Sequence, residues 1–522
     1  MIDKEDPAHK GNDARVFMAC IDSMSLPFAR AHLESLPVLK SMIAGGALLE
    51  LSSPGGVMSA SMWPTFTGCL DPGEHGQYHP FQWDAEAMNF RRIADKSWSD
   101  RFYCEPFWHA LARDGVETIV LDPGFVLRDE AAPGIQISNW SGQETGVASA
   151  SDPAILSELR RRFGRRPIGR EVPVPKSIGE SRKIRNDLIA AVRAKSDAIL
   201  WLMTKRNWRF FFAGFFEAHR AGHNLWPTDG AFASDVEEGA LLDVYREVDR
   251  QLARVFEAAA GENTTFILFA LHGMDENRVQ NHLLPQIMSR LNALYLKEKG
   301  QPSRARGGGA DVVSLLRKVV PFNIQYALAK SLGEGVQDWV VNRGLTAGLD
   351  WERTPAFHLA AGGEGYLRFN VKGRERLGYF EPDGPEIKAY EAWLRERLLR
   401  IKVAGADASL IKNVLSVRDL FVGGRSQYLP DLVLDWAPSA PAETIVSPDI
   451  GKITERLTTG RGGNHTGDSF MIVKGPGAAS RTLSEVAHIK DIGGYVVSLY
   501  RDDAVDGRRE AASFSPRVAE IA

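Results

Sequence analysis

Two histidines four residues apart are the strongest chemical signal in the sequence. His219 and His223 lie in the segment FEAHRAGH, directly after the apolar run RFFFAGF. On a helical turn, side chains at positions i and i+4 project from the same face, so both imidazoles can reach one metal ion. A single histidine is most often a core residue, but a pair with this spacing after a strand end predicts a metal site.

Polar residues able to join this pair lie beside other apolar runs. Asp22 follows RVFMACI, His272 follows TTFILFAL and His465 precedes SFMIVKG, while the hydroxyl-rich stretch MSASMWPTFTG carries Ser59 and Ser61. Alone, each residue has an ordinary explanation as a helix cap or a turn residue. Together they fall at one end of the inferred sheet, where the ligands of α/β proteins bind.

The types of these side chains indicate which ion they would bind. Imidazole nitrogens, a carboxylate and an ionised hydroxyl suit a borderline-soft divalent ion, zinc before manganese. The three cysteines are scattered and form no CxxC pair, which argues against a thiolate zinc site or a disulfide framework. A serine at the start of a helix faces backbone N–H groups, which favour an oxyanion or a phosphoryl group.

The elements that must position these residues follow from the alternation of short apolar runs with longer amphipathic stretches. This pattern is typical of a mostly parallel sheet covered by helices, so we expect an α/β fold. The expected strands of the core are residues 15–21, 47–51, 117–121, 135–138, 209–216, 265–271 and 469–474. The expected helices of the core are residues 29–43, 233–259 and 489–500.

The remaining sequence indicates insertions into this core. We expect residues 1–280 to form its first part, 281–355 a mainly helical insertion, 356–445 a small α/β subdomain, and 446–522 the return to the core with His465. The insertion contains the loop-like segment QPSRARGGGA. In the small subdomain the expected elements are strands at 365–371, 414–420 and 431–436 and a helix at 385–401.

Composition limits the class of partner. The chain has 522 residues, with 63 basic and 66 acidic side chains and a formal charge of -3. This balance argues against bulk binding of nucleic acid or of an anionic membrane. The polar N-terminus lacks the apolar run of a signal peptide, and the most apolar later stretch, 198–216, contains three cations. We therefore expect a cytoplasmic protein without a transmembrane segment that acts on a small molecule.

The order of the motifs resembles the alkaline phosphatase superfamily and, within it, the type I phosphodiesterase/nucleotide pyrophosphatase branch. The matching segments are CIDSM, SASMWPTFTGCLDPGEHG, FFEAHRAGH, FALHGM and GNHTGDSFMIVKGPG. The resemblance implies an alkaline-phosphatase-like three-layer sandwich with a mostly parallel central sheet. It also implies a metal-dependent hydrolase of phosphate esters that works through a phospho-enzyme intermediate.

The resemblance implies roles for individual residues. His219, His223 and His465 would hold one metal ion. The second ion would be lined by Asp22, Ser59 and His272. Ser59 is the implied nucleophile, because it stands four residues before the tryptophan of the motif, with Ser61 in reserve.

Two residues depart from the family pattern. His219 stands where an aspartate is usual, which exchanges an anionic ligand for a neutral one. Leu271 stands where the second ion would be bound by an aspartate, and a leucine cannot bind a cation. Glu217 or Asp275 is then an alternative ligand, and Glu217 could instead orient a ligand from behind. We therefore expect the second site to be weak or empty, which gives one or two ions per chain.

Other residues and other functions complete the expectations. Gln82, Asn139 and Arg368 are candidate substrate contacts, and His75 is expected to fix a turn. A sulfatase is disfavoured, since neither Ser59 nor Ser61 lies in the Cys/Ser-x-Pro-x-Arg motif of that class. The alternatives are a phosphomonoesterase or phosphomutase relative, and a non-catalytic metal- or ligand-binding member of the superfamily.

Overall fold

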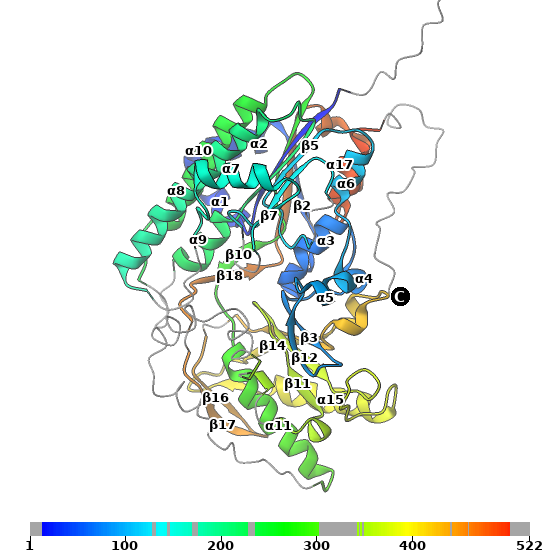
Figure 1. The fold of residues 1–522 in the computed structure, drawn as a ribbon. Helices are drawn as coiled ribbons and strands as arrows, with labels where there is room; N and C mark the ends of the chain where they lie inside the picture. Colours follow the sequence, from blue (N-terminus) through cyan, green and yellow to red (C-terminus); the bar gives the residue numbers. More distant parts are fainter. Residues whose placement is uncertain are drawn as a thin grey trace, which may run out of the picture.

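The computed structural model is organised around a large mixed sheet (Figure 1). The structure describes residues 13–127, 132–142, 147–169, 176–227, 235–301, 342–343, 345–346, 349–438, 441–457 and 459–501. The sheet has eight strands in the order β2-β19-β9-β1-β8-β5-β6-β7. Their bounds are β1 Arg15–Ile21, β2 Ala47–Leu51, β5 Thr118–Leu121, β6 Ile135–Ser138, β7 Ser149–Ala150, β8 Phe210–Phe215, β9 Thr264–Ala270 and β19 Ser469–Lys474.

The centre of this sheet is parallel and fully buried. Strand β1 pairs with β8 on one side and with β9 on the other, and β5 continues the parallel order between β8 and β6. Every residue of β8 (FFFAGF) is buried, as is nearly all of β1. Such continuous apolar strands occur where helices cover both faces of a sheet. The carboxyl ends of β1, β8 and β9 therefore meet at one edge.

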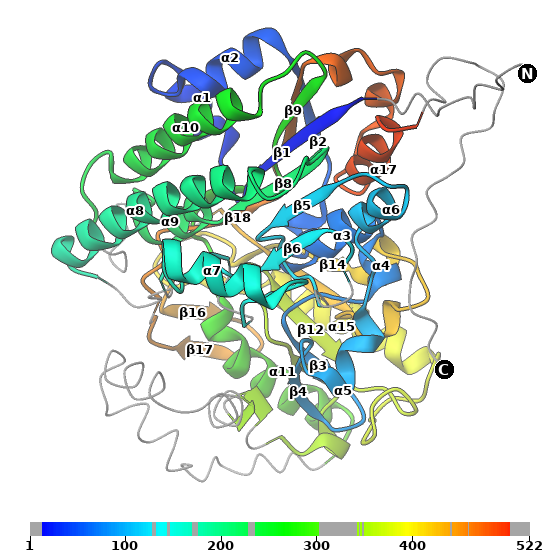
Figure 2. The same cartoon turned by 45° about the horizontal axis from the view of Figure 1, so that its top comes forward.

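Helices cover both faces of the sheet, which confirms the expected three-layer α/β class (Figure 2). One face carries α1 Leu26–Ala31, α2 Pro37–Gly45, α8 Ile178–Met203, α9 Glu217–Leu225 and α10 Ala240–Ala259. The other face carries α3 Met62–Gly68, α6 Phe107–Arg113 and α17 Asp491–Ser498. None of the helices in the described ranges combines the length and the hydrophobicity that crossing a bilayer requires.

Two helical expectations need correction. The single helix expected at 29–43 is α1, a short 3-10 turn (Leu33–Ser35) and α2, because Pro37 has no N–H and disfavours helical backbone at Leu36. Helix α8 was not expected. It begins at a capping box in which Ser177 and Glu180 bond each other's backbone N–H groups.

A smaller α/β unit packs below the core in the view of Figure 1. Its four-stranded sheet has the order β11-β12-β15-β14, and a three-stranded sheet has the order β13-β16-β17. The expected strand 414–420 is instead β14 followed by a helical turn at Val417–Leu420. The bounds are β11 Ala356–His358, β12 Gly365–Phe369, α15 Pro385–Leu399, β13 Lys402–Val403, β14 Ile411–Ser416, β15 Leu432–Trp436, β16 Thr444–Ser447 and β17 Gly451–Thr454.

The inserted region and its boundaries are described only in part. Helix α11 (Leu284–Glu298) lies within the expected helical insertion, whereas the loop-like segment after Gln301 lies outside the described residues. Strand β16 spans the expected boundary between residues 445 and 446 and pairs with both β13 and β17. The return to the core therefore begins after Thr454, at β18 (Gly463–Thr466) and β19.

Candidate metal and phosphoester site

The carboxyl edge of the central sheet collects the residues singled out above. Asp22 follows β1, α9 starts two residues after β8, and His272 follows β9. His465 comes from β18, which pairs antiparallel with β10 (Gly273–Glu276) so that it lies opposite Met274. Four segments far apart in sequence thus place Asp22 and four histidines at one point.

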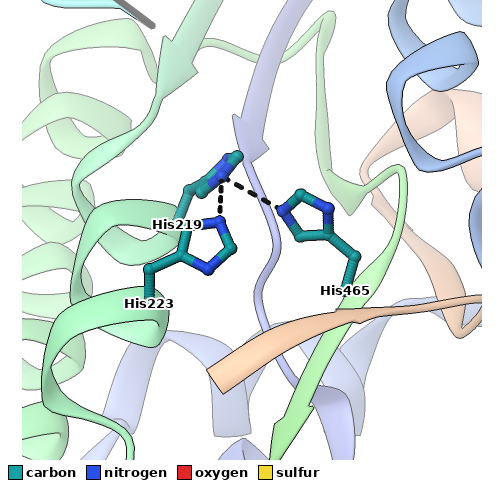
Figure 3. A group of neighbouring side chains, drawn as sticks. All are labelled: His219, His223 and His465. Carbon is teal, nitrogen blue, oxygen red and sulfur yellow. Dashed lines mark hydrogen bonds between the residues drawn. The ribbon is translucent and has the colours of Figure 1, made fainter. Parts of the chain in front are cut away.

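Three of the histidines point their Nε2 atoms at one another (Figure 3). The Nε2 of His219 is 2.9 Å from that of His223 and 3.2 Å from that of His465. His219 and His223 are four apart on α9, so the helical spacing brings the rings together as predicted. The donor atoms of all three residues lie within 4.8 Å of one another.

A second group shares His219 with the first. Asp22 Oδ2 is 2.5 Å from His219 Nδ1, and Asp22 Oδ1 is 3.5 Å from His272 Nε2. Burial of Asp22 opposes its ionisation. Attraction to His219 and hydrogen bonds from His219 and His272 outweigh this effect and lower the pKa of the carboxyl. Asp22 is therefore an anion facing two imidazoles.

The hydrogen bonds of the rings fix their tautomers. The ionised Asp22 can only accept from His219 Nδ1, and the carbonyl of Gly463 can only accept from His223 Nδ1, at 2.9 Å. Both rings therefore carry their proton on Nδ1 when neutral, so each Nε2 atom presents a lone pair. Burial, with the nearby positive charge of Arg461, lowers the pKa of His223 and keeps its ring neutral.

The residues fit a divalent cation. Two Nε2 lone pairs 2.9 Å apart do not bond each other, and a cation between them would satisfy both. Among the described residues, His465 Nδ1 is also buried without a hydrogen-bond partner. Burial and the neighbouring histidines lower the pKa of His465, which disfavours a proton in place of a metal.

Ser59 comes from a different part of the chain than these histidines and is held by a residue that the motifs did not indicate. It opens the 3-10 turn Ser59–Ser61 at the start of α3. Its Oγ donates to Glu364 Oε2 at 3.1 Å, and its backbone N–H donates to Oε1 at 2.9 Å. The reserve candidate, Ser61, is fully buried and donates to the carbonyl of Gln77 at 2.6 Å.

Ser59 and His465 are nevertheless close in the fold. The 3-10 turn Pro54–Gly56, just before Ser59, packs against β18. One pocket of about 150 Å³ is lined by residues of both segments, including Gly56, Glu364 and His465. The pocket therefore places Glu364, the hydrogen-bond partner of Ser59, beside His465 of the histidine group.

The two alternative ligands lie outside both donor groups of the described chain. Glu217 is fully buried and 3.5 Å from the Lys195 ammonium, which also lies 3.0 Å from Asp122. Burial raises the pKa of Glu217. Asp275 is exposed and 3.7 Å from Arg278. Leu271 is a fully buried member of the hydrophobic core.

Two of the candidate substrate contacts already form hydrogen bonds within the protein. Gln82 accepts from the N–H of Tyr78 and donates to the carbonyl of Gly76. Arg368 donates to Glu375 and to two carbonyls, those of Gln427 and Leu429. Asn139, half-buried after β6, has a left-handed backbone with φ of 57°.

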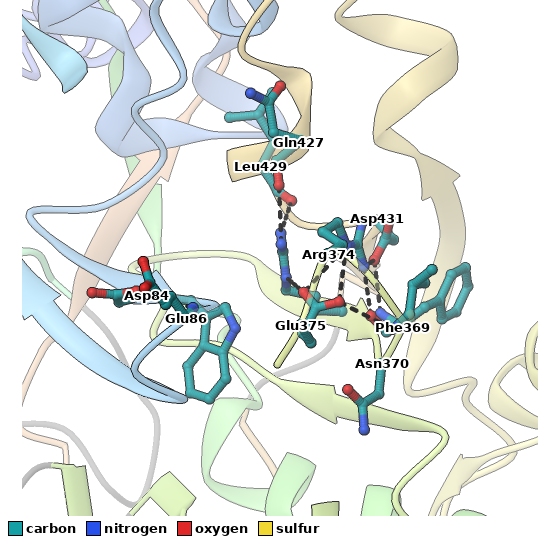
Figure 4. Close-up of polar contacts among 12 residues, drawn as sticks. Asp84, Glu86, Phe369, Asn370, Arg374, Glu375, Gln427, Leu429 and Asp431 are labelled. Carbon is teal, nitrogen blue, oxygen red and sulfur yellow. Dashed lines mark hydrogen bonds and ion pairs between the residues drawn. The ribbon is translucent and has the colours of Figure 1, made fainter. Parts of the chain in front are cut away.

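The neighbourhood of Arg368 is a polar network of the small unit. Arg374 pairs with both Glu375 and Asp431, which joins β12 to the segment before β15 (Figure 4). Both oxygens of Asp431 accept hydrogen bonds from Arg374, and one also accepts from the N–H of Phe369. These contacts assign the arginines a structural role.

His75 fixes a turn, and its burial predicts an acid-sensitive fold. Its Nδ1 accepts from the N–H of Gln77 and its Nε2 lies 3.0 Å from Thr65 Oγ1.

Burial lowers the pKa of His75 to about 3. Because the unfolded pKa is about 6.5, stability is complete above that pH and is lost as the pH falls toward 3, by up to ~1.4 kcal/mol per unit. Urea unfolding from about pH 7 to about pH 4.5 should therefore show a shallower loss in His75→Gln than in the wild type, and equal slopes would contradict this role.

Solved structures with low sequence identity match most of the chain. Phosphonoacetate hydrolase from Sinorhizobium meliloti 1021, in complex with phosphonoformate, is 14% identical, with 93% of this chain and 96% of that chain covered and a TM-score of 0.48. Murine ectonucleotide pyrophosphatase/phosphodiesterase 5, in complex with AMP, is 12% identical, with 94% and 96% covered and a TM-score of 0.46. No curated protein sequence matches the chain.

The sequence itself matches a family over about two thirds of its length. Residues 19–368 match the family described as type I phosphodiesterase / nucleotide pyrophosphatase. This range includes Asp22, Ser59 and three of the four histidines at the site. The match confirms the family that the motifs predicted, and the central sheet with helices on both faces confirms the α/β class. The chain therefore belongs to the type I phosphodiesterase / nucleotide pyrophosphatase family of phosphoric ester hydrolases.

Proposed function

We propose that the protein is a zinc-dependent phosphodiesterase in which Ser59 attacks phosphorus and forms a phospho-enzyme intermediate. The observation that carries this proposal is the convergence of three Nε2 atoms, from His219, His223 and His465, on one point at the carboxyl edge of the sheet. Three imidazoles are a common zinc donor set in catalytic sites, which leave a position open. The family supports a phosphodiester or a nucleotide pyrophosphate as substrate.

In this proposal Asp22 is a positioning residue for the metal site. It accepts from His219 Nδ1, so the ring directs its other nitrogen toward the ion. This arrangement accounts for a histidine where the family has an aspartate, since the negative charge is supplied from behind the ring. His272 faces the other oxygen of the same Asp22 carboxylate, at 3.5 Å.

The chain's own residues divide the work of ester cleavage. A bound zinc ion supplies a Lewis acid that stabilises negative charge on phosphoryl oxygens. Ser59, in the 3-10 turn before α3, supplies the nucleophilic oxygen. Water then hydrolyses the phosphoserine.

Metal analysis and turnover together test the proposal. We expect about one zinc ion per chain in the purified protein, because the three-histidine group forms one complete donor set. His223→Ala and His465→Ala should lose the ion and the cleavage of a bis-aryl phosphate. His282→Ala is the control, since this ring bonds the carbonyl of Ala442 outside the site.

Each contrary result has a defined meaning. Unchanged zinc content in His223→Ala and His465→Ala would show that the metal site is wrongly assigned. Faster cleavage of an aryl monoester than of the diester would favour the phosphomonoesterase alternative. A zinc-loaded protein that cleaves neither ester would favour the non-catalytic binding protein.

A further inference from the structure

The loop before β12 brings a carboxylate from the small unit onto Ser59. Glu364 lies 305 residues after Ser59 in the sequence, and its two oxygens accept from the Ser59 N–H and from the Ser59 hydroxyl. A Cβ atom placed on Gly362 would lie 3.4 Å from Ser59 Oγ, so this part of the loop is within van der Waals reach of the serine. The serine hydroxyl therefore faces this loop.

The carboxylate is held in one orientation. Glu364 is 6% exposed, and its Oε2 also accepts from the hydroxyl of Tyr366 at 3.0 Å and from the N–H of Gly363 at 3.2 Å. Burying a carboxylate is costly unless hydrogen bonds compensate for its lost hydration. Four donors converge on this carboxylate, two of them from Ser59. These hydrogen bonds fix the direction in which the serine hydroxyl points.

Activation of the serine hydroxyl by a second metal ion is weakened in this chain. Leu271 supplies no carboxylate for a second ion, and Asp22 already accepts from His219. Among the described residues, Glu364 belongs to neither of the donor groups that contain the histidines. It lines the same pocket as His465, so an ester bound there can contact both His465 and the carboxylate that holds Ser59.

We propose that Glu364 accepts the proton of the Ser59 hydroxyl during attack on phosphorus and so takes the place of a second metal ion. This inference rests on the proposed function. As the bond from Oγ to phosphorus forms, the bond from phosphorus to the leaving oxygen breaks and its electron pair stays with that oxygen. The hydroxyl proton moves to Glu364 Oε2. Water then attacks the phosphoserine, one of its protons passes to the leaving oxygen, and Ser59 regains its own proton from Glu364.

The test replaces the carboxylate by an amide of the same shape. Glu364→Gln should lower kcat for a bis-aryl phosphate by about 10²- to 10⁴-fold, the range for removing a general base. KM and the zinc content should stay near the wild type, whereas the thermal midpoint should fall, because the amide nitrogen of Gln would face the N–H of either Ser59 or Gly363. Glu364→Asp, which keeps a carboxylate, should recover part of the lost kcat.

A matched control separates lost chemistry from lost stability. Glu391 is a comparably buried glutamate of the small unit that pairs with Arg395 and Arg418, away from Ser59. Glu391→Gln should lower the thermal midpoint without lowering kcat. A fall in kcat for Glu364→Gln that is absent from Glu391→Gln at a similar loss of midpoint therefore supports proton acceptance.

Several outcomes would overturn the inference while leaving the proposed function intact. One is wild-type kcat in Glu364→Gln alongside an inactive Ser59→Ala. Another is loss of zinc from Glu364→Gln, which would make the carboxylate a metal ligand. A third is an equal loss of kcat and of stability in the Gln and Asp variants, which would show a structural role. An active Ser59→Ala would instead remove the proposed function itself.

Discussion

Ser59→Ala should lose at least about 10⁴-fold in kcat while the protein keeps its zinc, because removing a nucleophile removes the covalent route altogether. The metal should stay, since the three histidines hold it without the serine. Zinc content and single-turnover kinetics with a bis-aryl phosphate measure the two effects separately. Trapped enzyme should carry an aryl phosphoryl group on Ser59, because attack on the diester displaces only one of its two aryl groups, and peptide mass analysis would locate it.

Ser61→Ala is the matched control, two residues away in the same 3-10 turn. Its hydroxyl donates to the carbonyl of Gln77 and the side chain is fully buried. Loss of this hydrogen bond should cost about 1–2 kcal/mol of unfolding free energy and leave kcat within a few-fold of the wild type. The reverse result, an inactive Ser61→Ala and an active Ser59→Ala, would move the nucleophile to Ser61.

Lys195→Met should reduce the free energy of unfolding by about 3–5 kcal/mol, the usual effect of removing one partner of a buried ion pair. The Lys195 ammonium is fully buried and lies 3.0 Å from Asp122 and 3.5 Å from Glu217. It also donates to the carbonyls of Ser141 and Gly214. Without it, two buried carboxylates would face each other with no cation between them.

The control for this variant lies on the same helix. Lys183 of α8 is exposed and pairs with Asp187 one turn later. Lys183→Met should change the unfolding free energy by no more than about 0.5 kcal/mol. Urea unfolding of both variants gives the comparison. A loss of under about 1 kcal/mol for Lys195→Met would show that the cluster is not an ionic bridge.

Much of the core could be predicted because its signals are local. The apolar runs of β1 and β8 are continuous, so their strands begin and end close to where the sequence indicates. The pair His219 and His223 is readable from its spacing alone. The helix break before Pro37 also follows from a local rule, because proline disfavours helical backbone at the preceding residue. The long apolar pattern on both sides of Pro37 nevertheless favoured a single helix.

The remaining features depend on contacts between distant parts of the chain. Glu364 stands in an ordinary Gly-rich turn, and only the packing of the small unit against the core brings it to Ser59. Asp22 carries an acidic group at a strand end, but its partner nitrogen on His219 decides which role it takes. Gln82 and Arg368 have polar groups suited to a substrate, and the fold uses them internally.

The position of His465 in β18 has a consequence for the order of folding and metal binding. His465 stands 246 residues after His219, and its strand must pair with β10 before its ring can meet the others. Contacts of such long sequence separation form late, because loop closure has to be compensated by structure already in place. The three-histidine site is therefore complete only when the last part of the core has docked, so zinc uptake would report the end of folding rather than guide its beginning.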